Sequence, residues 1–196
     1  MHAVIILPGL GDEEELFRFA TRNWDKFGLA VYICPFGWKD FSSPFETKLL
    51  KLLSLIDSLY SQGFEVSLIG TSAGGTAVLN AYLEKKDKIK RVVTICSPLK
   101  PCDGHILRSF KNLCKINHIL GESIQRLNNK VNLLTHEDKK KIMTVSSHFD
   151  EIIPYDISTI SGARFLTIPT VEHFFGIFSA FVFFSRPIIE FIKSVK

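Results

Sequence analysis

Cysteine is scarce in this sequence, and its four copies form no metal-binding pattern. Cys34, Cys96, Cys102 and Cys114 contain no C-x-x-C pair and show no Cys/His spacing of the kind that binds zinc. The sequence therefore indicates neither a disulfide framework nor a metal site. We expect a reduced, cytoplasmic protein.

A long apolar run is also missing. The longest apolar stretch, residues 174–184, is far shorter than the ~20 residues that span a bilayer, so we expect no transmembrane segment. The apolar run that follows Met1 has no Lys or Arg before it and is too short for a secretory signal peptide.

Charge of one sign is in small excess, because the net charge is only +4. Two basic runs, residues 85–91 and 139–141, are not interleaved with aromatic residues. We interpret both runs as solvated surface and expect no nucleic-acid partner.

Phosphate-binding glycine motifs are absent or incomplete. The chain has no G-x-x-x-x-G-K-[ST] sequence, and the pair formed by Gly9 and Gly11 has Glu14 where a dinucleotide-binding motif needs a third glycine. Because acidic residues at this place would repel a pyrophosphate, we expect no nucleotide, and the function predicted below needs no cofactor.

What the sequence does contain is enough apolar material for one folded domain. Of its 196 residues 46% are hydrophobic and 22% are charged, which excludes a mainly disordered or collagen-like chain. A compact fold of this size buries roughly 70% of the surface that the unfolded chain exposes. We therefore expect a single domain over residues 1–196.

Short apolar runs rich in Val, Ile and Leu alternate with longer amphipathic runs. The short runs show little polar alternation, which suits strands that are buried on both faces of a parallel sheet. The expected strands are residues 3–7, 30–34, 65–69, 91–95, 142–146 and 164–168. Six strands alternating with helices predict a three-layer α/β sandwich with a mainly parallel sheet.

Helices are expected between these strands. Ser43 and Pro44 suit the N-cap and the first turn of one helix, and Pro187 should kink or split the last one. The expected helices cover residues 12–26, 43–63, 73–84 and 178–195.

The connection between residues 97 and 141 is longer than one crossover requires. It contains two helical patterns, residues 106–116 and 122–134, whereas one helix would complete the crossover. The surplus predicts a small cap over the carboxyl end of the sheet, where ligands bind in such folds.

The motif that indicates chemistry is a G-x-S-x-G sequence, which runs from Gly70 to Gly74 around Ser72. A predicted strand precedes it and a helix of small residues follows. This arrangement lifts a serine hydroxyl out of the sheet on a strained backbone. The two flanking glycines remove side chains that would collide in so tight a turn.

On these features the chain resembles the α/β-hydrolase superfamily, and most of all the small single-domain esterases and lipases that lack the first two strands of the full fold. The order of elements is similar over nearly the whole chain, but the likeness is specific only at four short stretches. The resemblance implies the strand order 2-1-3-4-5-6 and makes Ser72 the nucleophile.

The acid and the base follow from the same resemblance. The sequence D-x-x-[IV]-P that begins at Asp150 is similar to the family's acid loop, and a carboxylate there can hold an imidazole in one tautomer. His173 follows the last predicted strand, so that nucleophile, acid and base come in the family's chain order. Asp103 and Asp156 remain alternative acids, and His148 is an alternative base.

An oxyanion hole is implied by the loop after the first strand. The N–H groups of Leu10 and Ala73 would face the developing negative charge, with Ala73 at a helix N-terminus. Many relatives have His-Gly where this chain has Pro8 and Gly9, a difference that bears on how the loop is anchored. A plain tight turn is the alternative interpretation.

Together these residues predict a serine hydrolase that cleaves a carboxylic ester or thioester of a small molecule through an acyl-enzyme. A serine acyltransferase and a non-catalytic binding module of the same fold are the alternatives. Apolar residues near the base and in the expected cap either bind the substrate or pack helices on the sheet. These are Phe110, Phe174 and Phe175, together with Ile106, Leu107, Leu113 and Phe178.

Overall fold

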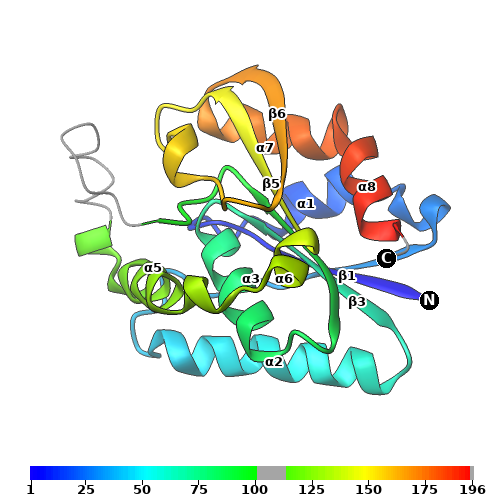
Figure 1. Ribbon diagram of the computed structural model, residues 1–196, viewed down its shortest axis with the longest axis horizontal. Helices are drawn as coiled ribbons and strands as arrows, with labels where there is room; N and C mark the ends of the chain where they lie inside the picture. Colours follow the sequence, from blue (N-terminus) through cyan, green and yellow to red (C-terminus); the bar gives the residue numbers. More distant parts are fainter. Residues whose placement is uncertain (101–113, 195–196) are drawn as a thin grey trace.

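Six parallel strands form one sheet in the order β2-β1-β3-β4-β5-β6 (Figure 1). This computed structural model describes residues 1–100 and 114–194. The strands are β1 (His2–Leu7), β2 (Leu29–Ile33), β3 (Glu65–Thr71), β4 (Ile89–Ile95), β5 (Ile142–Phe149) and β6 (Arg164–Val171). All six predicted strands are found, and their predicted order is confirmed.

The central strands β1, β3 and β4 are buried on both faces, which explains their continuous apolar runs. Every residue of β1 is buried. Its side chains alternate between two separate cores, with Ile5 and Leu7 in one and Val4 and Ile6 in the other. A strand with no solvent-facing side has no reason to carry polar residues at every second position.

Helices cover both faces of the sheet (Figure 1). Helices α2, α3 and α5 pack in the first core, and α1, α7 and α8 pack in the second. The helices are α1 (Glu14–Thr21), α2 (Phe45–Ser61), α3 (Ala73–Glu84), α5 (His118–Lys130), α6 (His136–Lys140), α7 (His173–Val182) and α8 (Ser185–Lys193). Short 3₁₀ turns are η1 (Trp24–Phe27), η3 (Val131–Leu133) and η4 (Tyr155–Ile157).

The first helix is shorter than its sequence pattern predicts. It begins at Glu14, because Asp12 has a left-handed backbone (φ +49°) and uses its carboxylate to accept the N–H groups of Phe36 and Trp38. The second helix begins one residue later than predicted, with Pro44 and not Ser43 at the N-cap.

The last helical region is split, but the break precedes the proline. Helix α7 ends at Val182, α8 begins at Ser185, and Pro187 lies in the first turn of α8, where a missing N–H costs nothing. Within the described part of the chain, no individual helix has the length and hydropathy to cross a membrane. Among the described helices, the pair α7 and α8 has this length and hydropathy only when the two are taken together, and their axes are bent by 60° at the break between them.

Helix α5 occupies part of the long connection between β4 and β5. It covers residues 118–130, a few residues before the predicted 122–134, and buries Ile119, Leu120 and Leu127 in the core it shares with α2 and α3. It therefore packs against the body of the domain. Most of the other predicted helix, residues 106–116, lies outside the described residues, so the cap stays a prediction.

The basic run at residues 85–91 lies beside acidic side chains. Its lysines form the ion pairs Lys85–Asp57 (2.9 Å), Lys86–Asp138 (2.7 Å), Lys88–Asp57 (2.6 Å) and Lys90–Glu65 (2.8 Å). Much of the positive charge of this run is thus offset locally, as in an ordinary solvated surface.

Candidate active site

Ser72 lies at the sharp turn that joins β3 to α3. Its backbone is left-handed (φ +49°, ψ −123°), a strained conformation for a residue with a side chain. A Cβ at Gly70 would collide with the backbone of Gly74, and a Cβ at Gly74 would collide with the carbonyl oxygen of Leu7. Both glycines are therefore required by close backbone approach, as the motif predicts.

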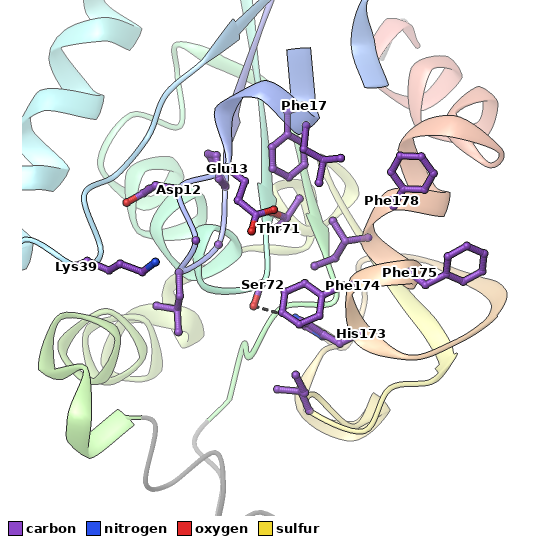
Figure 2. A pocket seen from close by; sticks show the side chains of 17 residues that line it. Asp12, Glu13, Phe17, Lys39, Thr71, Ser72, His173, Phe174, Phe175 and Phe178 are labelled. Carbon is purple, nitrogen blue, oxygen red and sulfur yellow. Dashed lines mark hydrogen bonds between the residues drawn. The ribbon is translucent and has the colours of Figure 1, made fainter. Parts of the chain in front are cut away.

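A chain of hydrogen bonds joins Ser72, His173 and Asp150. The His173 Nε2 atom lies 3.0 Å from Ser72 Oγ (Figure 2). Its Nδ1 atom lies 2.8 Å from one Asp150 carboxylate oxygen and 3.0 Å from the other. The side chains of His173 and Asp150 are each 2% exposed. The structure thus brings together the three residues that the sequence selects from distant segments.

Several hydrogen bonds keep the carboxylate of Asp150 ionised. Burial by itself would raise its pKa, but the hydrogen bond and charge of His173 and the N–H groups of Ile152 and Ile153 outweigh burial and leave the pKa below its ordinary value. An ionised carboxylate in this position holds the imidazole with Nδ1–H toward the acid and Nε2 toward the serine.

Two further carboxylates, which the sequence analysis did not select, fix the position of His173. The residue is the first of α7, and its backbone N–H donates to the Glu151 carboxylate at 3.1 Å. Glu172, at φ +81°, caps the same helix by accepting the N–H groups of Phe174 and Phe175. His173 is thus held at a helix N-terminus and not in a free loop as expected.

The loop after β1 lies directly against the serine. A Cβ at Gly9 would be 2.9 Å from Ser72 Cβ, and Leu10 lines the same pocket as Ser72. Ala73 is the first residue of α3, so its N–H is at the positive end of a helix dipole. Leu10 thus lies in the same pocket as Ser72, and Ala73 directly follows Ser72 in the chain, while their role as oxyanion donors stays a prediction.

Trp38 and Asp12 anchor this loop, in which Pro8 and Gly9 stand where many relatives have His-Gly. The indole Nε1–H of Trp38 donates to the Pro8 carbonyl at 3.1 Å, and Trp38 is fully buried. The Asp12 carboxylate binds the backbone of the Phe36–Trp38 segment at 2.8 and 2.9 Å. These contacts could not be predicted from the sequence, because they join residues 24 to 30 positions apart.

A pocket of about 580 Å³ opens beside Ser72 and His173. Its wall is mainly apolar, with Leu16, Phe17 and Ile177 joining the predicted Phe174, Phe175 and Phe178 (Figure 2). The Phe174 ring packs edge-on against the imidazole of His173, with ring centroids 5.5 Å apart. Phe110, another predicted pocket residue, lies outside the described residues, as do Ile106, Leu107 and Leu113.

The alternative site residues lie elsewhere or outside the described residues. His148 is exposed and packs against Phe149. Asp156 belongs to η4, where its backbone carbonyl binds Lys100 at 2.7 Å. Asp103 is outside the described residues. Among the described residues, Asp150 is the acid whose carboxylate hydrogen-bonds the imidazole of His173.

One group of described residues has possible metal ligands within 4.8 Å of one another. It consists of Cys96, Asp150 and His173. Their donor chemistry fits a cation poorly. Burial and the charge of Asp150 raise the pKa of the Cys96 thiol, and the imidazole Nδ1 is already bound to the carboxylate. A metal would need the thiolate and a free ring nitrogen.

Comparison with known proteins by sequence and by structure gave different results. No protein-family model and no curated protein matches the chain. Among solved structures, an α/β hydrolase enzyme, MGS-MChE2, from the metagenome of lagoon sediments at Mar Chica, Morocco, superposes with a TM-score of 0.72 at 18% identity. The match covers 98% of this chain and 90% of that one.

Two further solved structures are also similar to this chain. The monoacylglycerol lipase of Paleococcus ferrophilus has a TM-score of 0.70 at 16% identity, over 97% of this chain and 93% of its own. Est1E of Butyrivibrio proteoclasticus, in a structure with ferulic acid bound, has a TM-score of 0.61 at 17% identity, over 94% and 88%. At such identities the likeness establishes the architecture, and the chain has the α/β-hydrolase fold.

Proposed function

We propose that the protein is a serine hydrolase that cleaves a small carboxylic ester or thioester by way of an acyl-enzyme. The observation that carries this proposal is the continuous hydrogen-bond chain from the strained Ser72 through His173 to the ionised Asp150, at the wall of an apolar pocket. Structural likeness to lipases and esterases supports the reaction class but not the substrate.

In the first half of the reaction Ser72 becomes acylated. Its Oγ attacks the carbonyl carbon of the substrate while its proton passes to His173 Nε2. The oxyanion that forms accepts hydrogen bonds from the N–H groups of Leu10 and Ala73. The bond to the leaving alcohol or thiol then breaks, and the leaving group takes the proton from His173 Nε2.

In the second half a water molecule releases the acid. His173 Nε2 takes a proton from water, the water oxygen attacks the acyl carbonyl, and the ester bond to Ser72 Oγ breaks. Ser72 recovers its proton from His173. Asp150 remains ionised throughout and stabilises the imidazolium that exists in each half.

The pocket favours substrates with a short or medium apolar acyl group or an aryl acyl group. Aromatic rings from α1 and α7 form much of its wall, so an apolar chain or ring gains burial there. The ferulic acid held by Est1E is an aryl acid of this kind, on the same fold. The pocket is open enough for soluble esters to enter directly.

Hydrolysis of p-nitrophenyl esters with acyl chains of two to sixteen carbons tests this proposal. We expect the highest kcat/KM for short or medium chains and no rise in rate above the critical micelle concentration. Preference for the longest chains with activation at a lipid interface would instead indicate a lipase. Absence of hydrolysis across p-nitrophenyl esters and acyl thioesters would contradict the proposal, and acyl transfer to added alcohol in place of water would indicate an acyltransferase.

A further inference from the structure

Cys96 has a strained backbone and lies beside Asp150 and His173. It follows the last residue of β4, has a left-handed backbone (φ +48°), and is 1% exposed. Residues with side chains adopt this conformation at a cost, so a glycine would be the less strained choice. The preceding residue, Ile95, accepts the Ser72 backbone N–H at 2.9 Å, which ties this turn to the nucleophile.

The Cys96 side chain points at the acid and the base. One carboxylate oxygen of Asp150, one ring nitrogen of His173 and the Cys96 Sγ all lie within 4.8 Å of one another. This places the thiol beside the Asp150 carboxylate, close enough for the two groups to act on each other electrostatically. From the opposite side, α7 approaches at Gly176, where a Cβ would lie 3.5 Å from Sγ. The thiol is therefore enclosed between the acid and the helix that carries His173.

The thiol in this position is a donor. Burial and the neighbouring charges of Asp150 and Glu151 raise the pKa of Cys96 well above its ordinary value, so the S–H proton is retained. An ionised carboxylate can only accept, and both Asp150 oxygens already accept from His173 Nδ1, with Oδ1 also binding two backbone N–H groups. A protonated thiol beside this carboxylate can offer it a further side-chain donor.

We propose that Cys96 is a positioning residue of this site, whose thiol donates a hydrogen bond to Asp150 and so fixes the carboxylate against His173. The inference rests on the proposed hydrolase function. A buried, protonated thiol excludes Cys96 as a second nucleophile. Its strained, left-handed backbone allows this residue, which directly follows β4, to direct its side chain toward Asp150 in the loop after β5.

Removal of the thiol should change kcat and the pH profile together. Cys96→Ala leaves Asp150 with one donor fewer, so the carboxylate is less well oriented and its charge acts more strongly on the imidazolium. We expect kcat to fall about tenfold with KM unchanged, and the acidic limb of the kcat/KM profile to move to higher pH. The other charged groups near the pair or in the pocket are the same in every variant; they are Glu151, Glu172, Asp12, Glu13 and Lys39.

Cys96→Ser provides the rescue, because its hydroxyl can donate in place of the thiol. It should return kcat to within about threefold of wild type and restore the acidic limb. Cys96→Gly removes the thiol and relieves the left-handed backbone, so it serves if the alanine variant does not fold. Cys34→Ala, a partly buried cysteine after β2, is the matched control and should leave both readouts unchanged.

The outcomes separate this inference from the proposed function. Wild-type ester hydrolysis is measured first, and its absence would contradict the hydrolase proposal itself. If the wild type is active, an unchanged kcat and pH profile in folded Cys96→Ala or Cys96→Gly would overturn the role of Cys96 alone. A serine variant as impaired as the alanine variant would also overturn it, because packing and not donation would then be the cause.

Discussion

Strand β3 contributes a serine to two Ser–His–carboxylate clusters, one at each end of the sheet. At the carboxyl end are Ser72, His173 and Asp150. At the amino end Ser67 Oγ lies 2.8 Å from His2 Nε2, and His2 Nδ1 lies 3.8 Å from Glu65. The serine–histidine distance is even shorter in the second cluster, so residue types and this distance alone do not distinguish the two.

Their surroundings do distinguish them. Ser67 is fully buried inside β3, and Glu65, the carboxylate partner of His2, is 60% exposed. Ser72 stands one residue beyond the strand, on a left-handed backbone, at a pocket and a helix N-terminus. In parallel sheets the helices that follow the strands direct their N-termini to the carboxyl end, where anions and ligands are bound. The amino-end cluster is thus structural.

The largest expected effect comes from removing each serine. Ser72→Ala should lower kcat for ester hydrolysis by on the order of 10⁴–10⁶, because the nucleophile is lost. Ser67→Ala should leave kcat unchanged, because its hydroxyl only satisfies His2. Rates measured on folded protein at saturating ester check both. Comparable loss of kcat in the two variants would remove the distinction between the clusters.

The two carboxylates should differ almost as much. Asp150→Asn should lower kcat by about 10⁴, because an amide in this position favours the wrong imidazole tautomer. Glu65→Gln, at the exposed end of the other cluster, should have no effect on kcat. If Asp150→Asn retains activity and Asp103→Asn or Asp156→Asn loses it, the acid has been assigned to the wrong residue.

His2 should make the stability of the protein depend on pH. Burial, aided by the charge of Lys90, lowers the pKa of His2 from 6.5 to about 4. Between these values the unfolded chain binds a proton that the folded chain does not, so the free energy of unfolding falls as pH falls from 6.5 to 4 and this contribution is constant below that. The whole loss should be about 3 kcal/mol, of which about 2 kcal/mol falls between pH 7 and pH 4.5.

Urea denaturation at pH 7 and pH 4.5 measures this contribution. His2→Gln cannot titrate but can still hydrogen-bond Ser67, so the wild type should lose about 2 kcal/mol more than this variant between the two pH values. An equal loss in wild type and variant would show that His2 titrates normally in the folded protein.

The smallest effect concerns the loop that carries Leu10. Trp38→Phe keeps most of the ring but removes the N–H that binds the Pro8 carbonyl, so kcat should fall about three- to tenfold with KM unchanged. Trp24→Phe, in the other core, is the matched control and should reduce stability without reducing kcat. A change confined to KM would show that Trp38 shapes the pocket and not the oxyanion loop.

The fold was predictable because buried parallel strands produce runs such as those of β1 and β3, which need no distant information. The Ser72 turn was equally visible, since the strand, the glycines and the helix are all local. The two partners of Ser72 could be selected only through the chain order of the family, which pointed to Asp150 and His173. The structure brings these two residues together with Ser72.

Contacts between distant segments could not be predicted in this way. Trp38 binding Pro8, Glu151 binding the His173 N–H and Cys96 lying under Asp150 depend on which loops the sheet brings together. The residue types gave no signal, because a buried tryptophan or cysteine is most often simply core. The start of α7 at His173 was missed for a similar reason, since its capping residue is Glu172 and not one of the usual N-cap residues.

The most direct test of the central claim is to identify the residue that reacts with a fluorophosphonate probe. The account predicts that one serine is labelled, that peptide mapping places the label on Ser72, and that His173→Ala greatly slows the reaction. Label on any other residue, or no label on folded wild-type protein, would contradict the assignment of Ser72 as an activated nucleophile.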